Sequence, residues 1–206
     1  MEIYNKIYNK IFDWYCSSRS PDAGVDSIRS FTQNLQPGAK ILDIGCGHGH
    51  PITSTLLELG FKPYGIDSSI KMVTKFKNDF PSIPVQCSNV LSSDFFNTLF
   101  DAVIGYGFMF HLSQHQQEEV IEKVAKYLKQ DGYFLFNSGD EDGSEMTSPE
   151  YNGGVSFMTY SMSCFNYEKI LHKNDMVLIS HHIEKGFGST IYIAKKFSNN
   201  AINLNN

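Results

Sequence analysis

Three glycines alternate with other residues in the segment ILDIGCGHGH, residues 41–50, where they occupy Gly45, Gly47 and Gly49. Glycine lets the backbone approach a bound molecule closely and adopt conformations that side chains disfavour. Two acids accompany this loop: Asp43 lies two residues before Gly45, and Asp67 lies 22 residues after it. An acid at the end of a second strand accepts hydrogen bonds from ribose hydroxyls in nucleotide-binding sheets. These five residues therefore indicate a site for an adenosine-containing cofactor.

The spacing of the glycines separates two classes of cofactor. Dinucleotide-binding loops follow the pattern G-x-G-x-x-G, with a glycine at the sixth position. In GCGHGH the fifth position is a glycine and the sixth is His50, so the third glycine of that pattern is missing. The Asp43 carboxylate would repel a pyrophosphate, but it would attract a cofactor that carries an ammonium and a sulfonium. No GK[ST] follows the loop, which excludes a P-loop. A nicotinamide-dependent oxidoreductase stays as an alternative that leaves Asp43 unexplained.

The elements that position these residues alternate along the chain. Helical patterns predict helices over 51–59, over 68–78 and after Ser113, where Gln116 completes a capping-box signature. Short apolar runs between turn residues predict strands over 39–44, 63–67, 85–88, 100–107 and 131–138. Strands and helices in alternation form a doubly wound, parallel sheet of the α/β class. Ligands of such sheets bind at the carboxyl ends of the strands, where the glycines lie.

The two ends of the chain depart from this alternation. Wide apolar faces predict helices over 2–17 and 25–35, which make an N-terminal helical cap over 1–35. The runs at 176–184 and 189–196, joined by a turn at 186–188, predict a hairpin at one edge of the sheet.

The segment between the last parallel strand and this hairpin departs from the alternation of strands and helices. Residues 140–162 are expected to form an insertion on the substrate side, with a strand-like run at 154–162 and a short helix near 167–173. We predict one domain over 1–197 and a disordered tail over 198–206.

Composition excludes several classes of partner. The net charge is −5 and there is no basic run, which argues against nucleic acid as a partner. No stretch approaches the roughly 20 apolar residues of a membrane span, and the first residues lack the apolar core of a signal peptide. The four cysteines are scattered without a CxxC, so we expect free thiols in the cytoplasm. His181 and His182 point to opposite faces of a strand, so no metal site is expected.

Four motifs in order resemble those of class I S-adenosylmethionine-dependent methyltransferases: ILDIGCGHG, GIDSS, FDAVIGYGFMFHL and LKQDGYFLF. The resemblance covers about residues 36–139. It implies a seven-stranded, mostly parallel, Rossmann-like sheet whose C-terminal hairpin is antiparallel. It also implies that the cofactor is S-adenosyl-L-methionine and the product S-adenosyl-L-homocysteine.

The resemblance assigns cofactor contacts residue by residue. The three glycines approach the methionine and ribose portions, Asp43 positions the methionine amine directly or through water, and Asp67 holds the ribose diol. Asn89 stands where the family commonly has an aspartate that accepts from the adenine amino group. The other implied contacts are Arg19 at the methionine carboxylate, Cys46 as a small residue in the glycine turn, Ser68 and Met72 beside the adenine, Val90 next to Asn89, and Tyr106 near the sulfonium.

The methyl acceptor is expected beyond the fourth strand, in GYGFMFHL. His111 is the residue there whose ordinary pKa suits a general base at neutral pH; a structural or orienting role for it stays open. The aromatic side chains of Trp14, Phe110 and Tyr160 are candidate walls of the acceptor pocket, although such residues also serve as ordinary core.

The acceptor itself is expected to be a small organic molecule with an O, N or S nucleophile. The chain lacks the [DN]PP[YF] run that methyltransferases acting on exocyclic or amide nitrogens carry, and it has no basic patch for DNA or RNA. Two alternatives stay open: a catalytically silent protein that binds S-adenosylmethionine or S-adenosylhomocysteine, and a protein methyltransferase. The sequence predicts no oligomeric state.

Overall fold

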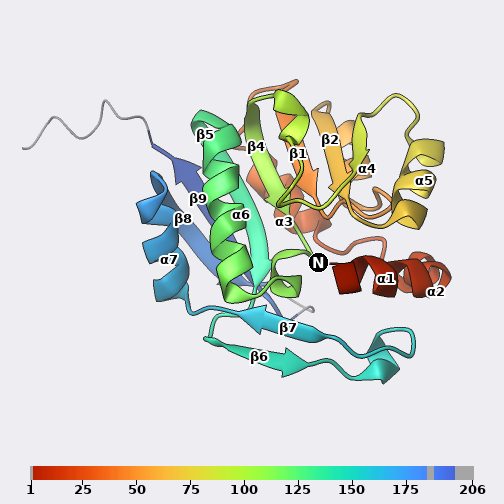
Figure 1. The fold of residues 1–206 in the computed structure, drawn as a ribbon. Coiled ribbons are helices and arrows are strands. Elements are labelled where there is room, and N and C mark those ends of the chain that lie inside the picture. The colour runs from red at the N-terminus through yellow and green to blue at the C-terminus, as the bar shows by residue number, and fades with distance from the viewer. Residues whose placement is uncertain (1, 185–187, 198–206) are drawn as a thin grey trace, which may run out of the picture.

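A seven-stranded sheet forms the centre of the molecule. The computed structural model describes residues 2–184 and 188–197. In space the strands run β3-β2-β1-β4-β5-β9-β8 (Figure 1). Their bounds are β1 Lys40–Ile44, β2 Lys62–Asp67, β3 Val85–Cys87, β4 Phe100–Gly105, β5 Leu128–Ser138, β8 Met176–Ile183 and β9 Thr190–Lys196.

Strand direction confirms the predicted sheet. The first five strands pair in parallel, whereas β9 runs antiparallel to both β5 and β8. Strand order reverses between β1 and β4, and ligands of open α/β sheets bind at such a reversal. The glycine loop follows β1 at this position.

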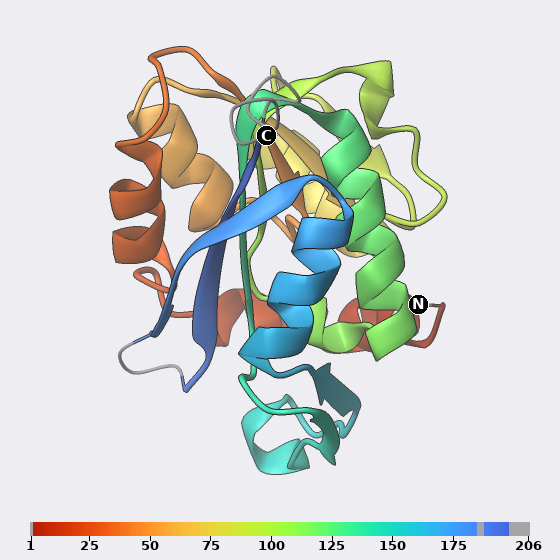
Figure 2. The ribbon, with the colours of Figure 1, turned by 90° about the vertical axis from the view of Figure 1, so that its left-hand side faces the viewer.

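Helices cover both faces of the sheet. Figure 2 shows α3 (Val25–Thr32) and α4 (Ile52–Glu58) on one side and α6 (Gln114–Tyr127) and α7 (Cys164–Lys173) on the other. Each pair has its own buried cluster. Phe31 and Leu56 pack against Ile41 and Leu135 on the first side. α5 (Ile70–Asp79) follows β2.

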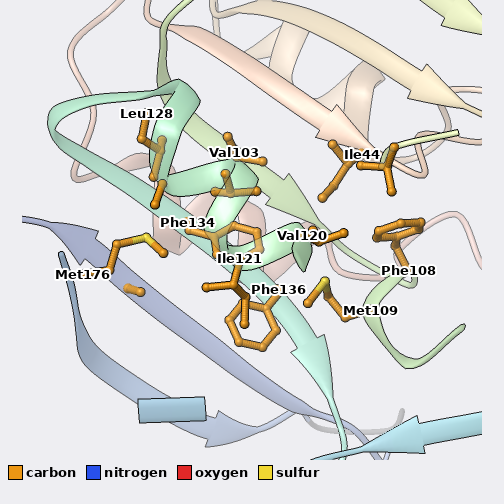
Figure 3. Packing of buried hydrophobic residues seen from close by; sticks show 14 of the residues in the cluster. Ile44, Val103, Phe108, Met109, Val120, Ile121, Leu128, Phe134, Phe136 and Met176 are labelled. Atoms are coloured by element: carbon orange, nitrogen blue, oxygen red, sulfur yellow. The ribbon is translucent and has the colours of Figure 1, made fainter. Parts of the chain in front are cut away.

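Helix α6 is anchored to the sheet as its sequence predicts. The side-chain oxygen of Ser113 accepts from the Gln116 backbone N–H, and the Gln116 side chain accepts from the Ser113 N–H, which completes the capping box. The apolar face of the helix buries Val120 and Ile121 near Phe134 and Phe136 of β5 (Figure 3). Val124 belongs to the same buried cluster. Fully burying one such aliphatic side chain contributes about 1.5–3 kcal/mol.

The N-terminal cap differs from the single helix predicted over 2–17. It consists of α1 (Glu2–Lys10) and α2 (Phe12–Ser18), which are separated at Ile11. The Ile11 backbone has φ −92° and ψ 12°, outside the α-helical region, and its side chain is buried.

The segment after β5 is more ordered than the predicted insertion. β6 (Gly143–Met146) and β7 (Met158–Ser161) form a separate two-stranded antiparallel sheet, so the strand within 154–162 is shorter than expected. α7 begins at Cys164 rather than near 167, because the Ser163 hydroxyl caps it by accepting from the Asn166 N–H. The expected turn at 186–188 lies partly, and the tail over 198–206 wholly, outside the described residues.

Three short 3₁₀ segments complete the description: η1 (Phe95–Asn97), η2 (Met109–His111) and η3 (Pro149–Tyr151). Among the helices of the described residues, none is long and apolar enough to span a bilayer.

Candidate active site

The three glycines of the loop after β1 are required for different reasons. All have positive φ, at 72°, 55° and 91° for Gly45, Gly47 and Gly49, a conformation that L side chains rarely adopt. A Cβ at Gly45 would lie 2.6 Å from Phe108, and one at Gly49 would lie 2.5 Å from Phe80. A Cβ at Gly47 would meet nothing closer than 4.0 Å. Gly47 is therefore the position where the missing side chain leaves room for a ligand.

Asp67 joins the glycine loop to the second strand. One carboxylate oxygen accepts from the Gly47 N–H at 2.9 Å, and the other accepts from the Ser69 N–H at 2.7 Å. Burial raises the pKa of this carboxyl although these hydrogen bonds oppose the rise. Each oxygen keeps a lone pair for a ribose hydroxyl. Asp67 thus fixes the loop and presents acceptors on the same wall.

Asp43 lies beneath the loop rather than in its open wall. It is 1% exposed, and the Thr53 hydroxyl donates a hydrogen bond to Oδ2 at 2.9 Å. Burial raises its pKa from 3.8 to about 7. The carboxyl is therefore poised to ionise near neutral pH when a cation comes close.

A pocket opens at the carboxyl ends of β1 and β2. Seven of the sequence-predicted residues line it: Gly45, Gly47, Asp67, Ser68, Met72, Val90 and His111. The residues that sequence reasoning did not assign to a ligand include Ser88, Gly107 and Phe108. We call this the cofactor pocket.

Three tyrosines of the cap roof the cofactor pocket. Tyr4 and Tyr8 come from α1 and Tyr15 from α2. The free space beneath them is about 60 Å³, far below the roughly 300–1,000 Å³ of small-molecule sites. A nucleoside-sized ligand therefore requires the roof to shift. The spacing of Tyr4 and Tyr8 by one helical turn was the sequence signal for this roof.

Two side chains of α1, Asn9 and Tyr4, bind the cap to neighbouring elements. The Asn9 side-chain oxygen accepts from the Ser69 hydroxyl at 2.8 Å and from the Lys71 N–H at 3.2 Å, which ties α1 to the start of α5. The Tyr4 hydroxyl donates to the Met158 carbonyl of β7 at 2.7 Å. The cap is thus fastened on both sides of the pocket.

His111 lies in η2, the short segment after β4 where the acceptor is expected. It is 5% exposed, its Nε2 lies 2.8 Å from the Tyr8 hydroxyl, and its Nδ1 is buried without a partner. Burial lowers its pKa to about 3 and raises the pKa of the Tyr8 phenol. Both groups are consequently neutral at physiological pH, and one hydrogen bond joins them.

Arg19 does not line the cofactor pocket; it lines an adjoining pocket, beside Gly107, which lines both. Its guanidinium carbon is 5.5 Å from the Tyr15 ring centre and 5.7 Å from that of Tyr106, and its Nε is buried without a partner. The Tyr106 hydroxyl donates to the Glu184 carboxylate at 2.8 Å. Tyr106 does not line the cofactor pocket; it supports the Arg19 guanidinium from beneath.

Four further sequence-predicted residues lie outside the cofactor pocket. The Asn89 side-chain oxygen accepts from the Leu91 N–H at 2.9 Å, and Ser88 lines the wall in its place. Cys46 is buried, with its sulfur close to Gly65, which agrees with a packing role. Trp14 and Phe110 line a second pocket, which adjoins the first.

Tyr160 lies farther away, on β7. It lines a polar hollow beside the β6–β7 hairpin together with Phe110, and its carbonyl accepts from Gln117 at 3.1 Å. Among the described residues no cluster of three His, Cys, Asp or Glu side chains could hold a metal ion.

Taken together, the reversed strand order, the glycine loop and the two acids define an α/β protein with a nucleoside-cofactor site. A family model described as "Methyltransferase domain" matches residues 41–132, which run from β1 into β5. The fold and this match over part of the chain support a class I S-adenosylmethionine-dependent methyltransferase.

Curated proteins and solved structures agree with that family. The chain is 29% identical over 147 residues to the carboxy-S-adenosyl-L-methionine synthase of Campylobacter fetus, a match that covers 66% of this chain and 58% of that protein. It is 23% identical over 163 residues to the phosphoethanolamine N-methyltransferase of Plasmodium falciparum, covering 76% and 60% of the two chains. The chain therefore spans less than two thirds of the length of both relatives.

The 1,6-didemethyltoxoflavin-N1-methyltransferase of Burkholderia thailandensis has a similar fold, with a TM-score of 0.72 at 15% identity. The match covers 96% of this chain and 90% of that one. That structure holds 1,6-didemethyltoxoflavin and S-adenosylhomocysteine.

Proposed function

We propose that this protein transfers the methyl group of S-adenosylmethionine to an O, N or S atom of a small organic molecule. The observation that carries the proposal is that Asp67 and Gly47 line one pocket while Arg19 lines the pocket that adjoins it, with Gly107 in the walls of both. The carboxylate oxygens of Asp67 suit a ribose diol. The half-buried Arg19, whose buried Nε has no partner, suits a carboxylate from the side of the adjoining pocket.

The donor set fits S-adenosylmethionine in the middle of the pocket as well. The Asp43 carboxyl, whose pKa lies near 7, ionises readily beside an ammonium group. Met72 and Val90 provide apolar surface at the ribose end, where an adenine ring would lie. When bound, this cofactor supplies an electrophilic methyl group on a sulfonium, and the acceptor takes it with loss of one proton.

Tyr8 and His111 are the groups that would receive that proton. The Tyr8 hydroxyl and the His111 Nε2 are within hydrogen-bonding distance at the end of β4, where the acceptor is expected. A neutral imidazole can accept from the phenol while the phenol accepts from the acceptor. Because burial disfavours the imidazolium, this pair suits an acceptor whose proton is already acidic, and it also serves to orient the acceptor.

The alternatives make different predictions. A catalytically silent binding protein would bind S-adenosylmethionine and leave every acceptor unmethylated. A protein methyltransferase would need the space between the cap and the β6–β7 hairpin to admit a peptide, whereas Tyr4 closes that side through its bond to Met158. A cytoplasmic location is proposed from the unpaired thiols, and no nucleic acid or membrane partner is proposed.

Calorimetric titration with S-adenosylmethionine tests the cofactor assignment. We expect binding in the wild type and a loss of about hundredfold in affinity in Asp67→Ala, since hydrogen bonds to a charged group contribute about 1.5–3 kcal/mol each. Asp26→Ala, which removes an exposed acid of α3, is the control and should bind as the wild type does. Binding of NADH instead of the methyl donor would show that the pocket has been assigned to the wrong cofactor. A screen for S-adenosylhomocysteine release with small acceptors then separates an enzyme from a silent protein.

A further inference from the structure

A second pocket lies against the cofactor pocket, and no methyl acceptor has been placed in it so far. Trp14, Tyr15 and Arg19 from the cap, Phe110 after β4, and Asn152 and Phe157 from the β6–β7 connection line it, and we call it the acceptor pocket. Its free space is about 340 Å³, within the range of small-molecule sites. The two pockets share Tyr8, Tyr15 and Gly107 in their walls.

The acceptor pocket is built by two segments that lie far apart in the sequence. The β6–β7 hairpin and the cap lie at the same end of the strands of the sheet (Figure 1). Gly153 fits so closely against Trp14 that a Cβ there would lie 2.8 Å from the indole. Phe157 is held by a backbone bond from the Thr147 N–H to its carbonyl at 2.9 Å. The aromatic walls are therefore fixed by the fold.

Charge in the acceptor pocket is scarce. Arg19 is the one charged side chain among the described residues that line it. A positively charged acceptor would be repelled by this guanidinium and by the donor's sulfonium. A phosphorylated or carboxylated acceptor would compete with the donor's own carboxylate for the same guanidinium, because no second cation lines the walls. An uncharged acceptor avoids both penalties.

The walls favour a ring. The lining includes four aromatic side chains, those of Trp14, Tyr15, Phe110 and Phe157. The Phe157 ring also packs 5.1 Å from the His111 ring, centre to centre. Planar molecules gain both buried area and stacking geometry against such walls. The Asn152 oxygen and the Ser20 hydroxyl add neutral polar groups at the rim.

We infer that the methyl acceptor is an uncharged planar aromatic molecule carrying a hydroxyl or ring N–H, bound between Trp14 and Phe157 with its nucleophile toward Tyr8. This inference rests on the proposed function and narrows its substrate class. It sets the chain apart from its phosphoethanolamine-methylating relative, whose named acceptor carries both a phosphate and an amine.

Trp14 is the single tryptophan of the chain, so its fluorescence reports on the acceptor pocket directly. Protein saturated with S-adenosylhomocysteine would be titrated at pH 6.5 with three probes that share one ring: 3-nitrophenol, which is neutral, 3-nitrobenzoate and 3-nitrobenzylamine. We expect saturable quenching by 3-nitrophenol at concentrations at least tenfold below those of the two charged probes. Phe157→Leu should weaken 3-nitrophenol binding about three- to tenfold and leave the affinity for S-adenosylhomocysteine unchanged.

The matched control is Tyr151→Leu, which removes an aromatic ring that is 78% exposed on the same connection and should change neither affinity. Equal or tighter binding of a charged probe would overturn the inference while leaving the proposed function in place. Release of S-adenosylhomocysteine when S-adenosylmethionine and phosphoethanolamine are supplied together would do the same. If S-adenosylhomocysteine does not bind in calorimetry, the proposed function fails, and the acceptor class fails with it.

Discussion

Asp43 offers a prediction in which binding and stability respond in opposite directions. Its carboxyl is 1% exposed, accepts one hydrogen bond from Thr53 and has a pKa of about 7 because of burial. If it attracts the ammonium of S-adenosylmethionine, the cofactor binds best to the ionised form. Cofactor affinity should then fall as pH falls through 7.

The size of this effect follows from the pKa. The apparent dissociation constant scales as one plus ten to the power of the pKa minus the pH. With a pKa of about 7, the constant is about eightfold larger at pH 6.0 than at pH 7.5. The cofactor's α-amino group, with an ordinary pKa of about 7.7–8.0, stays mostly protonated in this interval. Burial lowers the pKa of His48 to about 4 and that of His111 to about 3, so neither residue titrates here.

The stability of the ligand-free chain should respond the other way. The folded pKa of Asp43 lies above the ordinary 3.8, so the folded state holds the proton more tightly than the unfolded state does. Its contribution to stability is therefore greatest at low pH and is lost as pH rises from about 4 to about 7. At pH 7.5 the cost amounts to about 4 kcal/mol at most. Asp43→Asn, which keeps an acceptor for Thr53, should remove this cost and raise Tm.

The assays are calorimetric titration with S-adenosylmethionine and thermal unfolding, each at pH 6.0 and 7.5, on the wild type and Asp43→Asn. We expect the variant to bind about ten- to hundredfold more weakly at pH 7.5, to lose the eightfold dependence on pH, and to unfold at a higher temperature. An Asp43→Asn variant that binds as well as the wild type, or that retains the same pH dependence, would refute the role assigned to this carboxyl.

Three further predictions concern side chains that the fold brings to the cofactor. Glu184→Gln should weaken S-adenosylhomocysteine about tenfold but leave 5′-methylthioadenosine, which lacks the amino-acid end, unchanged in calorimetry, because the carboxylate acts through Tyr106 on Arg19; an equal loss for both ligands would mean a general structural role. Asn9→Ala removes two hydrogen bonds that hold the cap on α5 and should speed cofactor dissociation about tenfold in stopped-flow measurements, whereas an unchanged rate would mean that the cap opens elsewhere. Tyr8→Phe should lower kcat about hundredfold with cofactor affinity within twofold, measured as S-adenosylhomocysteine release with the acceptor that turns over, and a normal kcat would exclude the phenol from proton transfer.

Local signals explain why most of the fold could be predicted. Helix α6 has a capping box at Ser113 and an apolar face with helical spacing, and both depend only on nearby residues. The glycines at 45, 47 and 49 share positive φ, a requirement of the backbone itself. The separation of the cap at Ile11 could not be predicted in this way, because no Pro or Gly marks it and the side chain is buried by residues far along the chain.

The cofactor site likewise combines features that the sequence predicts with features that depend on tertiary packing. Gly47 and Asp67 belong to motifs whose order and spacing indicate the cofactor class, and both could be read from the sequence by itself. Tertiary structure alone decided that Tyr8 meets His111, 103 residues away, and that Tyr106 supports Arg19 instead of facing the cofactor pocket. It likewise brought Trp14 opposite the β6–β7 hairpin. Contacts within a motif follow from backbone geometry over a few residues, whereas contacts between the cap, the hairpin and the sheet depend on how separate elements pack, which no local spacing encodes.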